Sequence, residues 1–576
     1  MPRPEVWAPG AERVDLVLGD HRQPMARTVS GWFRAEVELT AGTDYLLAVD
    51  GGEPRPDPRS PWQPRGPHGP SRAVDHARFE WTDRGWRGFP LADAVVYEVH
   101  VGTFSSDGTF DGILTRLDHV LDLGVNAIEL MPVAEFPGER GWGYDGVDLY
   151  APHHTYGGPD GLKRVVDACH ARGLAVILDV VYNHLGPSGN YLGEFGPYFT
   201  DRYATPWGAA MNLDGADSDE VRRFIVDNAL TWLRDYHFDG LRIDAVHAIV
   251  DTSAVHILEQ LAVEVGALEA DLGRTLWVIA ESGLNDPLLV RSRDVGGYGL
   301  DAQWSDDFHH ALHAVLTGER AGYYVDFGRV ADIAAALERA FVYDGRYSSY
   351  RRRTHGRSTA GLSGHSFLAY AQDHDQIGNR ALGERLSHLV SGSLLKVAAA
   401  LVLTSPFVPM LFQAEEWGAG SPFLYFTDHS EEELGRAVGE GRRREFEAFG
   451  WEPEEIPDPQ DPSTFERSKL DWDEIESEPH AELLDWHQRL IDLRRRTPDL
   501  KDGRMSALRT TFDDDERWLV VERGRITIAC NFSGSPRTVP VSPDQASRVL
   551  LASTDDPPLA GHGLELPPES ATIFSS

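Results

Sequence analysis

From about residue 90 onward, apolar runs of strand length alternate along the chain with stretches of helical periodicity. A helix signal begins at Asp160 and ends at Gly173, and the apolar run 174–178 then follows as a buried strand. The same unit repeats twice more before residue 281. Repeated helix–strand units with nearly continuous apolar strands predict a parallel sheet that is covered by helices.

Eight segments of this region have the character of buried strands. They lie near 95–101, 125–131, 174–180, 240–244, 276–281, 300–304, 366–371 and 407–412. Eight parallel strands predict a closed (β/α)8 barrel, or TIM barrel, although an open doubly wound sheet has the same periodicity.

Both ends of the chain have a different pattern, in which short alternating runs are separated by Gly, Pro and Asp turn signals. The predicted α/β fold is therefore a catalytic (β/α)8 barrel at 89–500, flanked by β-sandwich domains at 1–88 and 501–576. Within the barrel region, the polar segment 416–475 is expected to be a long excursion after the last strand, and a helix is expected near 480–496.

The net charge of the chain limits the classes of molecule that it is expected to bind. The 576 residues carry a formal net charge of −37, which disfavours binding to nucleic acid and to anionic membranes but is compatible with a neutral sugar. The chain has neither a signal-peptide pattern nor an apolar window of membrane-spanning length, so a cytoplasmic location is expected. The two cysteines, Cys169 and Cys530, are far apart in the sequence and suggest no disulfide.

The sequence contains no motif for a metal, a nucleotide or a serine nucleophile. HExxH, paired CxxC, a strand-linked GxGxxG, a P-loop and GxSxG are all absent. The adjacent pairs His153–His154 and His309–His310 do not share one helix face. Neither a metal nor a cofactor is therefore expected.

Polar side chains gather where four of the predicted strands end. The residues are Asp179, Asn183 and His184; Arg242, Asp244 and His247; Glu281; and Asp373, His374 and Asp375. One acid at a strand end is most often a helix cap, but four successive cases on one face of a barrel favour an active site. Several carboxylates at one mouth suit a retaining glycoside hydrolase, whose two carboxyl groups lie about 5–5.5 Å apart. Neighbouring strands are about 4.8 Å apart, so adjacent strand ends can supply that spacing.

Two of these carboxyl groups, those of Asp244 and Glu281, have sequence neighbours that suit an ionised nucleophile and a protonated acid, respectively. Arg242 precedes Asp244 by two residues, so both side chains point to the same side of the strand, and the arginine favours an ionised carboxylate. Glu281 must keep a proton to protonate a leaving oxygen, and neighbouring negative charge would raise its pKa.

Four strings resemble the four shared regions of the α-amylase family of glycoside hydrolases. They are DVVYNH at 179–184, GLRIDAVH at 240–247, IAES at 279–282 and HDQIGN at 374–379. The resemblance implies that Asp244 is the nucleophile, Glu281 the general acid/base and Asp375 the stabiliser of the transition state.

The same resemblance implies a sugar-binding role for further residues. Arg242 would support Asp244, His184 and His374 would hydrogen-bond the sugar in the −1 subsite, and Tyr144 would stack against it. His247, Gln376 and Asn379 lie in the same motifs and are candidate binding residues. Simpler alternatives exist, because Tyr144 could be a core aromatic residue and His184 a helix cap. Asp373 departs from the family pattern, in which Asn is expected, and could shift the pH profile.

The subgroup within the family follows from longer strings. WGYDGVDLYAP at 142–152 is shared in outline with glycogen branching enzymes, whereas the strings at 183–191, 303–313 and 422–429 resemble the trehalose-releasing members. That resemblance implies hydrolysis of the α-1,4-glucosidic bond next to the terminal trehalose unit of maltooligosyl trehalose, a step in trehalose biosynthesis. A branching enzyme, a general α-amylase-type hydrolase and a glycan-binding scaffold with an inactive barrel are the alternatives.

A specificity for trehalose requires contacts in the leaving-group subsites. The candidates follow the sixth predicted strand and are Asp306, Asp307, Phe308, His309 and His310. The alternative interpretation is an ordinary helix N-terminus, because two aspartates suit a first turn.

Overall fold

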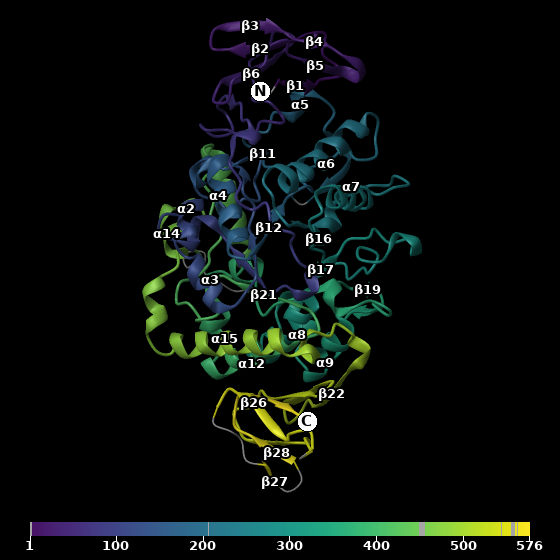
Figure 1. Cartoon of the computed structure of the whole chain (residues 1–576), viewed down its shortest axis with the longest axis vertical. Coiled ribbons are helices and arrows are strands. Elements are labelled where there is room, and N and C mark those ends of the chain that lie inside the picture. Colours follow the sequence, from purple (N-terminus) through teal and green to yellow (C-terminus); the bar gives the residue numbers. More distant parts are fainter. Residues whose placement is uncertain (1–2, 206, 448–455, 543, 555–558, 561–562) are drawn as a thin grey trace.

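The computed structural model describes the chain except residues 1–2, 206, 448–455, 543, 555–558 and 561–562 (Figure 1). Eight parallel strands form a closed barrel, which confirms the predicted fold class and rules out the open sheet. Each strand falls in one of the predicted segments. Around the barrel they are β8 (Val96–Val99), β9 (Ala127–Leu130), β12 (Ala175–Val180), β15 (Gly240–Ile243), β16 (Trp277–Ala280), β17 (Ala302–Trp304), β20 (Phe367–Ala369) and β21 (Val408–Phe412).

The interior of the barrel changes from apolar to charged along the strands. Val96, Ala127 and Ile177 belong to one buried apolar cluster. Two residues further along the same strands lie Glu98, Glu129 and Asp179, all buried. Side chains two residues apart on a strand share a face, so both layers face the barrel interior. Charge is thereby concentrated at the carboxyl ends of the strands, where a site is expected in this fold.

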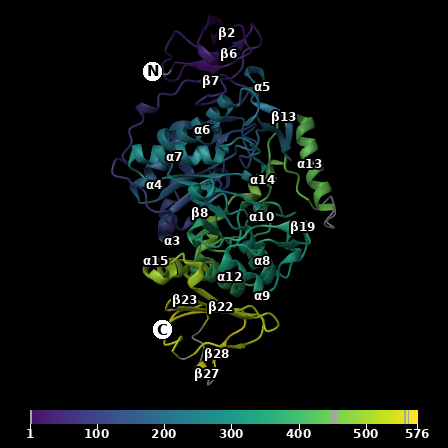
Figure 2. The same ribbon diagram turned by 90° about the vertical axis from the view of Figure 1, so that its right-hand side faces the viewer.

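Helices cover the outside of the barrel (Figures 1 and 2). The longer ones are α4 (Gly158–Ala171), α6 (Ser218–Asp235), α7 (Ile257–Leu272), α8 (Asp306–Thr317), α9 (Val330–Arg339), α12 (Gly392–Thr404) and α15 (His480–Arg496). Helix α4 shows why these segments fold so: Leu162, Val165 and Cys169 recur at helical spacing and are fully buried. Gly173, at φ +80°, then turns the chain into β12.

Small antiparallel sheets lie at opposite ends of the long axis (Figure 1). The N-terminal sheets have the orders β1-β5-β4 and β3-β2-β6-β7. The C-terminal sheets have the orders β22-β23-β24-β29-β26 and β25-β28-β27. The N-terminal strands are β1 (Glu5–Trp7), β2 (Val14–Leu18), β3 (His21–Pro24), β4 (Ala26–Arg27), β5 (Trp32–Arg34), β6 (Asp44–Val49) and β7 (Ser71–Arg72). The C-terminal strands are β22 (Leu508–Asp513), β23 (Trp518–Arg523), β24 (Ile526–Asn531), β25 (Arg537–Val539), β26 (Arg548–Ala552), β27 (Leu559–Ala560), β28 (Gly563–Leu566) and β29 (Ser570–Ser575).

Two buried arginines, Arg494 of α15 and Arg523 of β23, meet at the end of α12, and Arg523 attaches a C-terminal sheet to the barrel. Arg494 donates hydrogen bonds to the carbonyl oxygens of Leu403 and Ser405 at 3.0 and 2.8 Å, and Arg523 of β23 donates to that of Ser405 at 2.9 Å. These carbonyls end α12, where cations interact favourably with the helix dipole.

The polar excursion after β21 carries α13 (Glu432–Glu447) and α14 (Pro462–Ser468), and it is followed by α15 over the predicted helix 480–496. Cys169 and Cys530 are buried and unpaired. In the part of the chain that the structure describes, no helix has the length and apolar character needed to cross a bilayer.

Candidate active site

A cleft of about 450 Å³ opens at the carboxyl ends of the barrel strands. Seven of the predicted site residues line it: Tyr144, His184, Asp244, His247, Glu281, Asp375 and Asn379. They come from loops that are distant in sequence, and parallel strands bring them together because all their carboxyl ends meet at one mouth. Arg242 and His374 lie beneath this wall, fully or almost fully buried.

Arg242 links the carboxyl groups at the bottom of the cleft. Its Nη1 donates to both oxygens of Asp179 at 2.9 and 2.8 Å and to Oδ1 of Asp244 at 2.8 Å, while its Nη2 lies 3.9 Å from Oε2 of Glu281. The guanidinium also lies over the ring of Trp304, 4.3 Å from its centroid. Burial works against the cation, but the surrounding acids, Asp179 foremost, raise the pKa of Arg242 well above its usual value.

Asp244 is held as a hydrogen-bond acceptor on both oxygens. Oδ1 accepts from Arg242, and Oδ2 accepts from Nδ2 of Asn183 at 2.8 Å. A side chain that only accepts suits a carboxylate rather than a neutral acid. The side chain is 13% exposed, enough to open into the cleft. Asp244 is therefore fixed in orientation by Arg242 and Asn183 and open to the cleft.

Glu281 has the opposite character. Burial raises the pKa of this carboxyl well above its usual value; Arg242 opposes that shift, and Asp244, Asp306 and Asp375 add to it. Its Oε2 accepts a hydrogen bond from the backbone N–H of Ala245 at 2.6 Å. Ala245 has φ +41°, a left-handed conformation that is costly for alanine and is often found at functional sites. Glu281 is thus held in place as an acid that keeps its proton.

His374 connects the cleft to the charged layer of the barrel. Its Nδ1 hydrogen-bonds Glu98 of β8, and its Nε2 lies 2.7 Å from the hydroxyl of Tyr144 and 3.7 Å from Oδ1 of Asp375. Burial alone would lower the pKa of His374, but the negative charges of Glu98 and Asp375 outweigh it and raise the value to about 10. The half-exposed Asp375 therefore lies beside an imidazole whose raised pKa favours the cationic form at neutral pH.

Replacing Glu98 with glutamine should lower the pKa of His374 towards its ordinary range and reduce kcat/KM by about tenfold to a hundredfold, because a neutral imidazole no longer fixes Tyr144 and Asp375 equally well. NMR titration of labelled imidazoles should show His374 losing its proton near neutral pH in this variant. In the parent protein His374 should keep its proton up to about pH 10.

Glu129→Gln is the matched control. Glu129 faces Glu98 across the neighbouring strand, and burial raises its pKa well above the usual value, so glutamine there removes no charge at neutral pH. An unchanged titration of His374 in Glu98→Gln would contradict the role given to Glu98.

Asp373 and Gln376 form a cap at the start of α10 (His374–Gly378). Oδ1 of Asp373 accepts from the backbone N–H groups of Asp375 and Gln376 at 2.9 and 3.2 Å, and Gln376 Oε1 accepts from the N–H of Asp373 at 3.0 Å. Burial raises the pKa of Asp373 well above its usual value. The side chain of Gln376 is thus engaged in the helix cap and is not part of the cleft lining, whereas Asn379 Nδ2 donates to Oδ1 of Asp375 at 3.3 Å.

None of the five predicted residues after β17, Asp306 to His310, belongs to the lining of the cleft. Asp307, Phe308 and His309 are buried in α8; Asp307 Oδ2 accepts from the backbone N–H groups of Val342 and Tyr343, both at 2.7 Å. Asp306 lies closer to the chemistry, since its charge contributes to the raised pKa of Glu281. His310 is 6% exposed, with its ring 4.7 Å from that of Tyr323.

Sequence reasoning missed several residues of the cleft wall. The cleft also contains Trp207, Asp145, Tyr425 and His429. Trp207 is 48% exposed and stacks on His184 with 5.3 Å between ring centroids, so it offers an open aromatic face. It lies between the hairpin strands β13 (Phe199–Thr205) and β14 (Gly208–Met211). Its only sequence signal was a bulky aromatic residue in a turn of small residues.

Comparisons with known proteins agree with this geometry. The family model "Alpha amylase, catalytic domain" matches residues 77–202, and "Domain of unknown function (DUF3459)" matches residues 503–573. The chain is 56% identical over 499 residues to malto-oligosyltrehalose trehalohydrolase of Arthrobacter ramosus, covering 86% of this chain and 87% of that protein. It is 48% identical to the protein of the same name in Mycobacterium tuberculosis, covering 100% and 99%. A crystal structure from Salmonella typhimurium, of a protein described as an alpha amylase, superimposes with a TM-score of 0.91 at 38% identity, covering 100% of this chain and 97% of that one.

Proposed function

The chain belongs to the family of malto-oligosyltrehalose trehalohydrolases, and from this premise we propose that it hydrolyses the α-1,4-glucosidic bond next to the terminal trehalose unit of maltooligosyl trehalose. The observation that carries the chemistry is the pair Asp244 and Glu281. Both side chains lie beside Arg242. Asp244 accepts a hydrogen bond from its guanidinium, and Glu281 has a strongly raised pKa. A retaining glycosidase needs one ionised and one protonated carboxyl group.

In the first step Glu281 donates its proton to the glycosidic oxygen while Asp244 Oδ attacks the anomeric carbon. The bond between that carbon and the oxygen breaks, and trehalose leaves with the proton. The sugar ring then carries a β-linked ester to Asp244. Asp375, half exposed beside the cationic His374, interacts with the positively charged ring of the transition state.

In the second step the ionised Glu281 takes a proton from water as the water attacks the anomeric carbon. The ester bond breaks, Asp244 is released as a carboxylate, and the shortened maltooligosaccharide leaves with the α configuration retained. Tyr144, His184 and Trp207 form the wall against which the −1 sugar would pack. Asp306, whose charge acts on Glu281 and on Asp375, and His310 are our candidates for the leaving-group side.

The test is a comparison of two substrates of equal length, maltooligosyl trehalose and the plain maltooligosaccharide, with products identified by chromatography. We expect trehalose to be released from the first substrate, with attack on the second slower by at least about tenfold, because a pocket shaped to one disaccharide leaves polar groups unpaired with another. Proton NMR should show the shortened maltooligosaccharide as the α-anomer before mutarotation.

The same assay separates the alternatives. Equal attack on both substrates would replace the trehalose specificity with a general α-amylase-type activity and leave the roles of Asp244 and Glu281 intact. New α-1,6 branches on amylose, without net hydrolysis, would instead identify a branching enzyme that uses the same carboxyl groups.

A further inference from the structure

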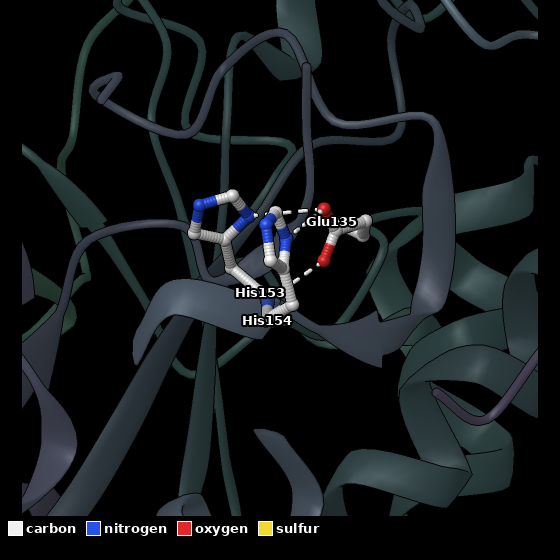
Figure 3. Close-up of side chains that lie close together, drawn as sticks. All are labelled: Glu135, His153 and His154. Atoms are coloured by element: carbon white, nitrogen blue, oxygen red, sulfur yellow. Dashed lines mark hydrogen bonds and ion pairs between the residues drawn. The ribbon is translucent and has the colours of Figure 1, made fainter. Parts of the chain in front are cut away.

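Three side chains with metal-binding chemistry, which belong neither to the cleft lining nor to the catalytic groups, lie close together (Figure 3). Glu135 ends the short strand β10 (Ala134–Glu135), which pairs with β11 (Asp148–Pro152). His153 and His154 directly follow β11. The hairpin therefore brings the carboxylate of Glu135 next to two imidazoles that follow it by 18 and 19 residues in the sequence.

The nitrogens of both rings point to one carboxylate oxygen. Oε1 of Glu135 lies 3.2 Å from Nδ1 of His153 and 2.7 Å from Nδ1 of His154, and one atom from each of the three side chains lies within 4.8 Å of the others. Oε2 of Glu135 accepts the backbone N–H of His154 at 2.8 Å, which fixes the direction of the carboxylate. The ring of Phe136 stacks on His153 with 3.7 Å between centroids and shields it from one side.

His153 is the unusual member of the group. Its side chain is 0% exposed, and neither ring nitrogen has a hydrogen-bond partner in the part of the chain that the structure describes. The contact of its Nδ1 with Glu135 has the distance of an ion pair but not the direction of a hydrogen bond. Burying an imidazole without a hydrogen bond is costly, and a metal ion bound at Nδ1 beside Glu135 would satisfy this nitrogen.

We propose that Glu135, His153 and His154 bind a divalent transition metal ion of the zinc type. In a tetrahedral zinc site with bonds of about 2.0–2.2 Å, two ligand atoms lie about 3.3 Å apart, close to the distance between His153 and Glu135. The 2.7 Å contact of His154 is a hydrogen bond, which the ion would replace. Two imidazoles suit zinc better than calcium or magnesium, which require oxygen ligands.

Three protein ligands leave the fourth coordination position of the ion free. This position would lie on the side of His154, whose side chain is 23% exposed. Water can occupy it, and the ion can enter from there. The ion would close the base of the loop 136–147, which runs from Glu135 to β11 and carries Trp142 and Tyr144 into the cleft. This site would be structural, since it holds the loop and takes no part in the reaction.

The test uses the full-length protein, stripped of metal with a chelator and checked by elemental analysis. Zn²⁺ is then titrated in competition with a chromophoric chelator, and thermal unfolding is followed with and without Zn²⁺. We expect one Zn²⁺ per chain at this site and a higher Tm with Zn²⁺. His154→Gln should weaken the binding by at least about a hundredfold and abolish the shift in Tm.

His21→Gln is the matched control, because His21 is an exposed histidine of β3 in the N-terminal sheets, and this variant should bind Zn²⁺ like the parent. Co²⁺ is the second probe: its visible bands should indicate four ligands, including nitrogen, in the parent protein and change in His154→Gln. Absence of one-to-one binding, or equal affinity of the parent and His154→Gln, would show instead that the three side chains are only a hydrogen-bonded cluster.

Discussion

Replacing Asp244 with asparagine should lower kcat for maltooligosyl trehalose by at least about 10⁴-fold, which corresponds to about 5 kcal/mol of lost transition-state stabilisation. Asparagine has the same shape but cannot form the glycosyl ester, so the first step has no nucleophile. Its amide can still accept one hydrogen bond, and Arg242 keeps its two contacts with Asp179. The protein should therefore fold, and initial-rate kinetics together with thermal unfolding check both statements.

Asp219→Asn is the control for that experiment. Asp219 is an exposed aspartate in the first turn of α6, remote from the cleft lining, and its replacement should leave kcat unchanged. A turnover within about tenfold of the parent in Asp244→Asn would remove Asp244 as the nucleophile. If the parent protein itself released no sugar from any α-glucan, the barrel would be a binding scaffold rather than an enzyme.

Replacing Glu281 with glutamine should reduce kcat/KM for the natural substrate by about 10²–10⁴-fold, because the leaving trehalose can no longer receive a proton. A maltooligosyl fluoride leaves without protonation, so the first step with this substrate should be far less affected. The variant should then release a burst of fluoride equal to the enzyme concentration and stall as the glycosyl ester, since no base activates water.

The pH dependence gives a second measurement of Glu281. Burial raises the pKa of its carboxyl well above the ordinary value, so the group is protonated at low pH and loses its proton as the pH rises through that raised pKa. The kcat/KM of the parent protein should fall along that alkaline limb. The limb should be absent when Glu281→Gln acts on the fluoride, and equal losses on both substrates would contradict the role of Glu281 as the acid.

The sequence by itself predicted eight parallel strands and placed the candidate catalytic groups Asp244 and Glu281 at the ends of two of them. The strand segments around 174–180 and 240–244 were readable because a parallel strand is buried on both faces and so becomes a continuous apolar run. Asp244 and Glu281 were readable because they come directly after such runs, and the ends of parallel strands in a closed barrel all lie at one mouth. Local patterns are enough to find the strands and the polar residues at their ends, whereas the closure of the barrel was decided by the structure.

Only the tertiary structure decided the partners of each group. Glu98 reads as a polar residue inside an apolar strand, and its contact with His374 is visible only when β8 and α10 meet in the closed barrel. Trp207 and Glu135 have no motif around them, yet folding brings one into the cleft and the other to His153 and His154. Conversely, Phe308 and His309 were predicted to contact the leaving-group sugars, but both side chains are buried in α8. The physical reason is the same in each case. Burial and pairing depend on residues that are distant in sequence, whereas the hydrophobic periodicity of a segment shows only which face of that helix or strand is apolar.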